Sequence, residues 1–315
     1  MNHGRNGGNR TNATGGMLGH SNAKGVFLAR VLRNEPICRD HWQFVLALER
    51  FPPAMPGQFL QILCADPAAQ QGTGGAFLRR PFSIGGLRRR GGGAEIVILH
   101  RAIGRGTQWL SHRAPGDAVS ILGPLGQPFR ILDDCPAALL VGGGIGLPPL
   151  IWLAESLRAA GKKTIAFCGA RTADLMPLTR SGDVTVSGGE SAFAFREFAD
   201  VGVPVVAATD DGSLGAAGTI AEVFARYLIH QPETACSAAV YTCGPEPMIR
   251  AVARRCERDG IPCQVCLERM MACGMGTCQS CVVRVRDDQA DDGWRYRLCC
   301  TDGPVFDSQT VIWDE

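Results

Sequence analysis

The feature that most constrains this chain is a glycine-rich cysteine cluster near its C-terminus. Cys273-Gly274-Met275-Gly276-Thr277-Cys278-Gln279-Ser280-Cys281 has the spacing C-x4-C-x2-C, and the adjacent pair Cys299 and Cys300 follows. Three thiolates from one loop and a fourth from further along the chain are the plant-type ligands of a [2Fe-2S] cluster. A loop that wraps a cluster must bend tightly and direct backbone N–H groups at sulfur, which glycine permits. The spacing therefore predicts an iron–sulfur centre.

Two other readings of the cysteines are weaker. Cys263-x2-Cys266 together with Cys278-x2-Cys281 suits a zinc site of four thiolates, but it leaves Cys273 and the Gly-x-Gly loop unexplained. A disulfide framework is typical of small secreted chains that carry a signal peptide. Residues 1–24 are rich in Gly and Asn and have no apolar core segment, so they predict a disordered tail and not a secretory signal. We therefore expect reduced thiols in a cytoplasmic protein.

Length and charge narrow the class of protein. The chain has 315 residues, which corresponds to about two domains at roughly 150 residues each. Its 32 Lys and Arg nearly balance 30 Asp and Glu, so the charge gives no indication of binding to nucleic acid or to anionic lipid. The longest apolar runs, such as Ala137–Val141, fall far short of the roughly 20 residues that cross a bilayer. We expect neither a nucleic-acid partner nor a membrane span.

Three segments with different residue patterns predict a multi-domain fold. Residues 25–132 contain short alternating segments separated by Pro and Gly, which predict an antiparallel β-barrel. Residues 133–260 repeat an apolar strand, a Gly-rich turn and a helix, which predicts an α/β domain with a parallel sheet. Residues 261–315 contain the cysteine cluster and have too little apolar sequence to fold without a stabilising cross-link. This segment therefore predicts a small [2Fe-2S] domain.

The barrel segment carries a candidate flavin motif. In Arg80-Pro81-Phe82-Ser83, the guanidinium can pair with a pyrophosphate, the aromatic ring can pack on the cofactor, and the hydroxyl can reach the isoalloxazine edge. Alone, this run is also compatible with a proline that only punctuates a strand. Gly104-Arg105-Gly106-Thr107 opens a helical stretch, whose first N–H groups favour a phosphate.

Two turns in the α/β segment are candidate dinucleotide sites. Gly142-Gly143-Gly144-Ile145-Gly146-Leu147-Pro148-Pro149 follows an apolar strand and precedes a helix, the setting in which glycines cradle a dinucleotide phosphate. It departs from G-x-G-x-x-G, because Leu147 or Pro149 stands where the third glycine belongs. Cys243-Gly244-Pro245 has the same setting. Both turns should lie at the carboxyl edge of one sheet, where ligands bind.

These motifs, in this order, resemble the ferredoxin–NADP reductase superfamily, from about Gly25 onward. The C-terminal segment, with the run Cys300-Thr301-Asp302-Gly303-Pro304, resembles the electron-transfer subunits of two-subunit, NAD-linked dihydroorotate dehydrogenases. The N-terminal tail is extra, Cys299 stands beside the expected ligand, and residues 181–200 fit the pattern poorly and look like an insertion.

The resemblance implies FAD, a [2Fe-2S] cluster and NAD as cofactors, and an FMN-containing catalytic partner subunit, together forming a heterotetramer. Dihydroorotate would be oxidised by the partner, and its electrons would pass through the cluster and FAD to NAD in pyrimidine biosynthesis. No catalytic acid or base for the pyrimidine is expected in this chain. The implied cofactor-binding residues are Arg80, Pro81, Phe82, Ser83, Leu99, His100, Arg101, Gly106, Thr107, Gly143, Gly144, Gly146, Cys243, Gly244 and Pro245.

The implied cluster ligands are Cys273, Cys278, Cys281 and Cys300. Successive side chains on a strand point to opposite faces, so Cys299 is expected to be a spectator. Two other functions stay open at the level of sequence. The chain could be a flavin and iron–sulfur reductase subunit for another partner, such as a ferredoxin-linked transhydrogenase or a sulfur reductase, or it could be a zinc-bearing binding protein.

Overall fold

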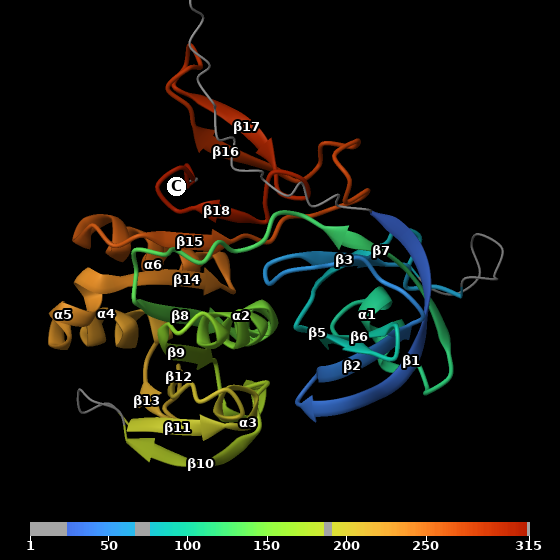
Figure 1. The fold of residues 1–315 in the computed structure, drawn as a ribbon, viewed down its shortest axis with the longest axis horizontal. Helices are drawn as coiled ribbons and strands as arrows, with labels where there is room; N and C mark the ends of the chain where they lie inside the picture. Colours follow the sequence, from blue (N-terminus) through green and yellow to red (C-terminus); the bar gives the residue numbers. More distant parts are fainter. Residues whose placement is uncertain (1–23, 67–75, 186–190, 314–315) are drawn as a thin grey trace, which may run out of the picture.

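The structure, a computed structural model, describes residues 24–66, 76–185 and 191–313. The predicted N-terminal tail, apart from Lys24, lies outside the described residues. Figure 1 shows a barrel of β-strands beside an open α/β sheet, with the C-terminal segment lying along both. The multi-domain fold predicted from the sequence is confirmed.

The barrel is a curled antiparallel sheet with the strand order β4-β3-β7-β1-β2-β6-β5. Its strands are β1 (Gly25–Cys38), β2 (His41–Leu48), β3 (Phe59–Ile62), β4 (Arg80–Ser83), β5 (Gly86–Arg90), β6 (Gly93–Arg101) and β7 (Ala118–Leu125). The connection between the two edge strands closes the barrel, because Ile84 N–H donates to the Gln58 carbonyl and Gly85 N–H donates to the Val97 carbonyl, at 3.0 and 2.8 Å. Alternate residues, such as Leu60 and Ile62, fill the interior.

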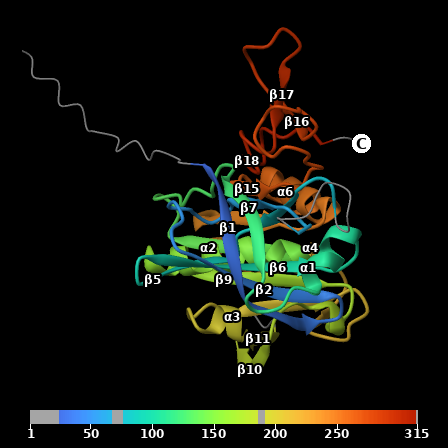
Figure 2. The ribbon, with the colours of Figure 1, turned by 90° about the vertical axis from the view of Figure 1, so that its right-hand side faces the viewer.

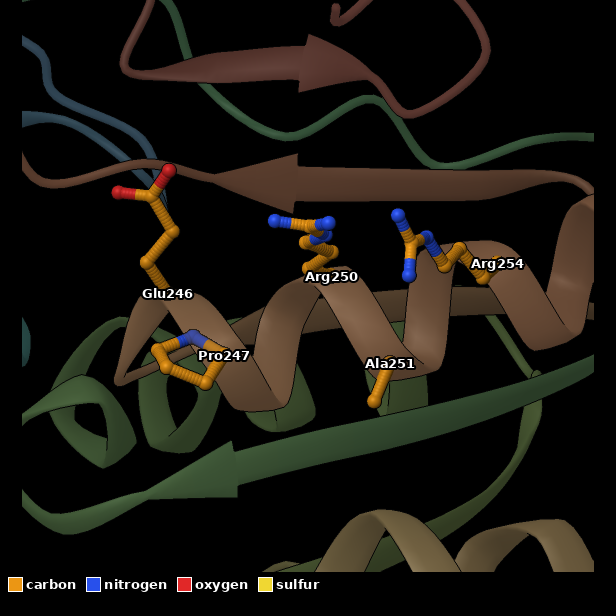
Figure 3. Close-up of a pocket in the computed structure, with 5 residues that line it drawn as sticks. All are labelled: Glu246, Pro247, Arg250, Ala251 and Arg254. Atoms are coloured by element: carbon orange, nitrogen blue, oxygen red, sulfur yellow. The ribbon is translucent and has the colours of Figure 1, made fainter. Parts of the chain in front are cut away.

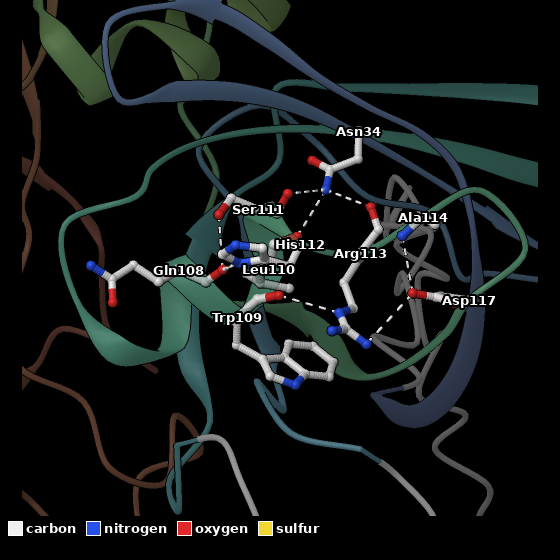
Figure 4. A network of polar contacts seen from close by, with 9 residues as sticks. All are labelled: Asn34, Gln108, Trp109, Leu110, Ser111, His112, Arg113, Ala114 and Asp117. Atoms are coloured by element: carbon white, nitrogen blue, oxygen red, sulfur yellow. Dashed lines mark hydrogen bonds and ion pairs between the residues drawn. The ribbon is translucent and has the colours of Figure 1, made fainter.

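A short helix, α1 (Arg105–Ser111), is fixed to the barrel wall by Asn34 of β1. The Asn34 side-chain amide donates to the carbonyl oxygens of Leu110, Ser111 and Arg113 at 2.8, 3.2 and 2.8 Å (Figure 4). Carbonyls at a helix C-terminus have no partner within the helix, so this amide satisfies them. The guanidinium of Arg113 also stacks over the Trp109 ring at 4.1 Å. The loop that follows α1 is therefore fixed by Asn34 of β1 and by the contact of Arg113 with Trp109.

The second sheet has a parallel centre and antiparallel edges, in the order β10-β11-β12-β9-β8-β14-β15-β18, with β13 beside β12. Its strands are β8 (Ala137–Gly143), β9 (Lys163–Ala170), β10 (Arg180–Thr185), β11 (Ser191–Phe195), β12 (Val205–Thr209), β13 (Ala216–Ala217), β14 (Ala238–Cys243), β15 (Cys263–Cys266) and β18 (Val305–Asp307). The sheet is parallel from β12 to β15, as predicted. The segment 181–200, which fits the superfamily pattern poorly, forms much of the antiparallel pair β10 and β11 at one edge.

Helices cover both faces of this sheet. Leu139 and Val141 of β8 face a core with α4 (Ile220–His230) and α6 (Glu246–Asp259), whereas Ala138 and Leu140 face α2 (Leu147–Ala159) and α3 (Arg196–Ala199). Short helices η1 (Gly144–Gly146), η2 (Ala173–Leu175) and α5 (Pro232–Ser237) complete the domain. Figure 2 shows the barrel strands in front of this layered sheet. Trp152 of α2 packs into the barrel core, which joins the two domains.

The C-terminal segment contributes to the second sheet as well as to the cysteine region. β15 and β18 pair with each other and extend the sheet beyond β14, and β16 (Val282–Arg286) and β17 (Trp294–Leu298) form a separate hairpin. The cysteines Cys281, Cys299 and Cys300 lie in the same hydrophobic core as β14 and α6. Burial against the neighbouring domain thus supplies the apolar contacts that this segment lacks by itself.

Within the described residues, no helix is long and apolar enough to cross a bilayer.

Candidate functional site

A cleft of about 920 Å³ lies between the barrel and the carboxyl edge of the parallel strands. Fourteen of the fifteen cofactor residues implied by the sequence line it: Arg80, Pro81, Phe82, Ser83, Leu99, His100, Arg101, Thr107, Gly143, Gly144, Gly146, Cys243, Gly244 and Pro245. Long-range folding therefore brings the two sets of sequence motifs to one site. Ligands of open α/β sheets bind at this edge, because strand-to-helix turns meet there.

On the barrel side, the motif Arg80–Ser83 forms β4, which pairs with β3. The Arg80 guanidinium donates to the Leu78 carbonyl at 2.9 Å, so the segment just before β4 holds it in place. The Phe82 ring is buried and meets the His100 ring edge to face, with centroids 6.2 Å apart. This side of the cleft combines a cation with aromatic surface, as a flavin dinucleotide requires.

His100 is the most unusual polar group of the cleft. It is 1% exposed, and neither ring nitrogen has a hydrogen-bond partner among the residues that the structure describes. Burial, with a smaller effect of His41, lowers the pKa of His100 to about 4, so the ring is neutral at physiological pH. Buried polar groups are normally hydrogen-bonded, so these nitrogens suit a ligand that brings its own donors and acceptors. Its neighbour Arg101 forms an ion pair with Asp40 at 3.7 Å.

At the start of α1, the Thr107 hydroxyl accepts hydrogen bonds from Gly104 N–H at 3.1 Å and Ile103 N–H at 3.2 Å. Both N–H groups precede the helix, which begins at Arg105, so the phosphate site expected at the first N–H groups of the helix stays a prediction. Gly106 is the implied cofactor residue that does not line the cleft. A Cβ there would lie 3.3 Å from Cys64 Cβ and 3.4 Å from Arg80 Cγ, so this glycine allows α1 to pack beneath the flavin motif.

On the sheet side, the two predicted dinucleotide turns are in direct contact. A Cβ built on Gly146 would lie 2.4 Å from the Cys243 carbonyl oxygen, and one on Gly244 would lie 3.0 Å from Gly143 N. No side chain fits at either position without moving backbone. α2 then begins with Pro148 and Pro149 in its first turn, where a missing N–H leaves no bond unmade. Gly146 and Gly244 are required because the two turns pack directly against each other and together form one wall of the cleft.

The sequence missed several residues of the cleft. Asp210 after β12, Thr219 before α4 and the run 266–269 before the cysteine loop all line it. Arg269 donates to both carboxylate oxygens of Glu246, at 2.7 and 3.3 Å, and so ties the cysteine segment to α6. The sequence feature that could have indicated these residues is their position, because each lies next to a strand or motif that the sequence does predict.

A shallow depression of about 530 Å³ adjoins the cleft along α6 (Figure 3). Pro247 and Ala251 line both hollows, and Arg250 and Arg254 project from the next turns of the helix. Glu246, at the start of the depression, is already paired with Arg269. The depression therefore extends the cleft on the side of the two glycine turns, and Arg250 and Arg254 give it a positively charged edge.

The cysteine loop has the polar contacts that a sulfur cluster needs. Met275 N–H and Cys278 N–H both donate to Cys273 Sγ at 3.4 Å. Gly274 and Gly276 have φ of +72° and +91°, conformations that favour glycine. A hydrogen bond with the Ser280 hydroxyl, followed by backbone hydrogen bonds, lowers the pKa of Cys278 to about 6. These contacts favour the thiolate of Cys278, the form that binds iron.

Cys299 and Cys300 lie in the turn after β17 and not on a strand, so the alternation of faces expected from the sequence does not apply to them. Their contacts nevertheless differ. The Cys299 thiol donates to the Leu267 carbonyl at 3.3 Å. Burial, followed by a hydrogen bond with Cys281, raises the pKa of Cys300 to about 12, and Cys273 acts on the same thiol. The Cys300 thiol therefore bonds to a loop cysteine, whereas the Cys299 thiol, although also close to Cys281, bonds to a backbone carbonyl. These contacts support Cys273, Cys278, Cys281 and Cys300 as the ligand set.

The four thiols form two neighbouring pairs, Cys273 with Cys278 and Cys281 with Cys300. The described part of the chain has no group of three or more His, Cys, Asp or Glu residues arranged around a single metal ion. Two pairs of thiolates suit a two-iron cluster, which takes four cysteines. The donor set therefore fits a [2Fe-2S] group.

The zinc alternative fails on geometry. Cys263 and Cys266 are three residues apart on β15, so they face opposite sides of the sheet and belong to different hydrophobic cores. Cys263 hydrogen-bonds with Cys256, and Cys266 with Cys243. They cannot join Cys278 and Cys281 around one ion.

Comparison with known proteins decides the family. A family model described as the iron–sulfur cluster binding domain of dihydroorotate dehydrogenase B matches residues 268–312. The electron transfer subunit of dihydroorotate dehydrogenase B (NAD(+)) from Caldanaerobacter subterraneus subsp. tengcongensis is 33% identical over 285 residues, which cover 90% of this chain and 98% of that protein. The chain belongs to the family of dihydroorotate dehydrogenase B electron transfer subunits. The member from Bacillus caldolyticus is 38% identical over 261 residues, 82% of this chain and 86% of its own.

Solved structures agree on the fold of this family member. An NADH-dependent reduced ferredoxin–NADP oxidoreductase superposes with a TM-score of 0.70 and 25% identity, over 90% of both chains. The ferredoxin reductase of a carbazole 1,9a-dioxygenase gives a TM-score of 0.58 at 25% identity, over 76% of this chain and 67% of that one. The sequence resemblance to the reductase superfamily is confirmed.

Proposed function

We propose that this chain passes electrons from a dihydroorotate-oxidising, FMN-containing partner subunit, through a [2Fe-2S] cluster and FAD, to NAD in pyrimidine biosynthesis. The observation that carries the proposal is the shared cleft: one cavity is lined by the flavin motif on β4, by the two glycine turns and by the residues that lead into the cysteine loop. When bound, the cluster carries single electrons and the flavin exchanges one or two, which joins one-electron transfer to the two-electron chemistry of nicotinamide.

The barrel side is proposed to bind FAD. Arg80 pairs with the pyrophosphate through charge-assisted hydrogen bonds, Phe82 packs against the cofactor, and the Ser83 hydroxyl orients the isoalloxazine edge. Leu99, His100 and Arg101 of β6 and Thr107 of α1 complete the site. The neutral, unpartnered ring of His100 orients the flavin by hydrogen bonding without adding a charge.

The sheet side is proposed to bind NAD. Gly143, Gly144 and Gly146 bring backbone close to the dinucleotide, and Cys243, Gly244 and Pro245 complete the same wall. Because these turns face the barrel across the cleft, it is the cleft that would bring the nicotinamide and the flavin together. Cys273, Cys278, Cys281 and Cys300 hold the cluster beside strand β3, which pairs with the flavin strand β4.

The division of labour is also part of the proposal. Residues 25–132 act as the flavin domain, 133–260 as the nucleotide domain and 261–315 as the cluster domain, in a cytoplasmic heterotetramer with the catalytic subunit. The pyrimidine chemistry is assigned to that subunit. Electrons therefore enter this chain at the cluster and leave at the nucleotide edge.

An anaerobic titration of the purified chain with NADH tests the proposal. Its absorbance spectrum should contain a flavin band with iron–sulfur shoulders, and chemical analysis should find two irons and one FAD per chain. NADH should bleach both features. A colourless protein, or a flavin that NADH does not reduce, contradicts the proposal.

A second candidate, a reductase subunit that serves a different partner, is favoured by the TM-score of 0.70 to the ferredoxin–NADP oxidoreductase. The higher identity to dihydroorotate dehydrogenase subunits, 33% over 98% of one relative, favours the first. Both give the same NADH titration. Identification of the partner that co-purifies with the native protein separates them.

A further inference from the structure

Gln61, on the barrel strand β3, is a buried amide. The residue is 0% exposed, and within the described ranges 24–66, 76–185 and 191–313 neither Nε2 nor Oε1 has a hydrogen-bond partner. Its neighbours Leu60 and Ile62 point into the barrel core. Gln61 therefore points outward, on the same face as Phe59, which packs in the core that contains Cys281, Cys299 and Cys300.

The side chain ends against the cysteine loop. A Cβ built on Gly274 would lie 2.6 Å from Gln61 Cγ and 2.7 Å from Nε2. Gly274 follows the ligand Cys273 directly, and its φ of +72° turns the chain at this point. A glycine is required here because the amide takes the space of a side chain. Strand β3 runs beneath the C-terminal segment in Figure 1.

An unpaired buried amide is costly, so the fold should supply a partner when all its cofactors are bound. Sulfur atoms of a cluster accept hydrogen bonds and do not donate them. Of the two amide atoms, only Nε2 can therefore gain a partner from the cluster. Met275 N–H and Cys278 N–H already donate to Cys273 Sγ from the loop itself. Gln61 would add a donor from the flavin domain.

We propose that Gln61 is a positioning residue for the [2Fe-2S] cluster: its side-chain amide, held by β3 against Gly274, donates to a cluster sulfur and raises the reduction potential. The inference rests on the proposed function, because it requires the cluster to be bound. Reduction adds one negative charge to the cluster, so an N–H donor stabilises the reduced form more than the oxidised form. The flavin domain thereby adjusts the potential of the centre that delivers its electrons.

The test is a redox titration of the holoprotein, followed by the EPR signal of the reduced cluster, for Gln61→Met and for a matched control, Gln127→Met. Gln127 is a second amide that joins the barrel to the C-terminal segment, but it donates to the Thr301 carbonyl at 2.8 Å. At the midpoint potential of the unsubstituted protein, Gln61→Met should lower the ratio of reduced to oxidised cluster about tenfold, since hydrogen bonds to charged groups are strong. Gln127→Met should change it less than about twofold.

An unchanged midpoint in Gln61→Met overturns the proposal. An equal shift in both variants also overturns it, because that result would come from a loosened interface. Iron and flavin content of the unsubstituted protein are measured first. If the iron is absent there, it is the proposed function that fails.

A second measurement needs no substitution of Gln61. Pulsed EPR is recorded on the reduced holoprotein labelled with ¹⁵N in the glutamine side-chain amides, in a Gln127→Met, Gln279→Met background. These changes remove the amide that bonds to Thr301, beside Cys300, and the amide that follows Cys278. A ¹⁵N coupling to the cluster, with an exchangeable proton, is expected. Absence of that coupling overturns the proposal even if Gln61→Met fails to assemble.

Discussion

The thiol of Cys299 donates a hydrogen bond to the carbonyl oxygen of Leu267 at 3.3 Å. The thiol of Cys300, the next residue, hydrogen-bonds with Cys281. Two adjacent thiols thus have different environments. Their order along the chain does not reveal which one binds iron, but their contacts do.

The first prediction follows from this difference. Cys300→Ser should abolish or strongly perturb the EPR signal of the reduced cluster, because it removes a ligand. Cys299→Ser should leave the signal nearly intact, since its hydroxyl can keep the bond to Leu267. Iron content per chain checks both variants. The reverse pattern would move the ligand to Cys299, and equal partial loss would mean that either thiol can serve.

The second prediction concerns flavin retention. Arg80→Ala should weaken FAD binding by about 1.5–3 kcal/mol, because a charge-assisted contact to the pyrophosphate is lost. Equilibrium titration of the flavin-free protein with FAD measures the change. Arg90→Ala is the control, since that exposed arginine pairs with Glu95 outside the cleft. Unchanged affinity in Arg80→Ala would remove Arg80 from the flavin site.

The third prediction concerns the two glycine turns of the nucleotide site. Gly146→Ala places a methyl group 2.4 Å from the Cys243 carbonyl, so the two turns must separate. Overpacking of this kind costs about 1–3 kcal/mol, and we expect the Kd for NADH to rise about tenfold or more with FAD content unchanged. Gly182→Ala, where nothing lies within 4 Å, should have no effect. Equal NADH affinity in all three proteins would place the nicotinamide elsewhere.

The fourth prediction is a pH dependence of stability caused by His100. Burial lowers its pKa from 6.5 to about 4, so between these values the unfolded chain binds a proton that the folded chain does not. Stability should therefore rise with pH across this window and be lost as the pH falls from 6.5 towards 4, by up to about 3 kcal/mol. Thermal unfolding of flavin-free protein at pH 4.5 and 7 measures it. His100→Gln should lose less than the unsubstituted chain on acidification; an identical loss refutes the buried neutral imidazole.

Much of the fold could be predicted from local patterns. Alternation in residues 43–48 and 95–99 predicts strands that the structure has, and the Gly-rich turn at 142–146 predicts the strand-to-helix crossing of β8 and α2. These features depend on residues that are close in sequence. The phosphate site expected at the start of α1 stays a prediction, because the Thr107 hydroxyl bonds to N–H groups that precede the helix.

What could not be predicted depends on long-range pairing. Cys263–Cys266 has no alternation of polar and apolar residues and lies close to the cysteine cluster, so the sequence assigns it to the cluster domain. In the structure it is a strand that pairs with β14 and is buried on both faces. Gln61 is similar. Within a barrel strand a glutamine usually faces solvent, and only the position of Gly274, more than 200 residues away, makes it part of the cluster site.

The most direct test of the account is an anaerobic assay of dihydroorotate oxidation coupled to NAD reduction, with the chain alone, its FMN-containing partner alone, and the two combined. The chain alone should reduce an artificial acceptor with NADH and should not oxidise dihydroorotate. The combined subunits should form NADH from dihydroorotate and NAD, and Cys300→Ser should stop that transfer. Dihydroorotate oxidation by the pure chain, or full NADH formation by the partner without it, would contradict the account.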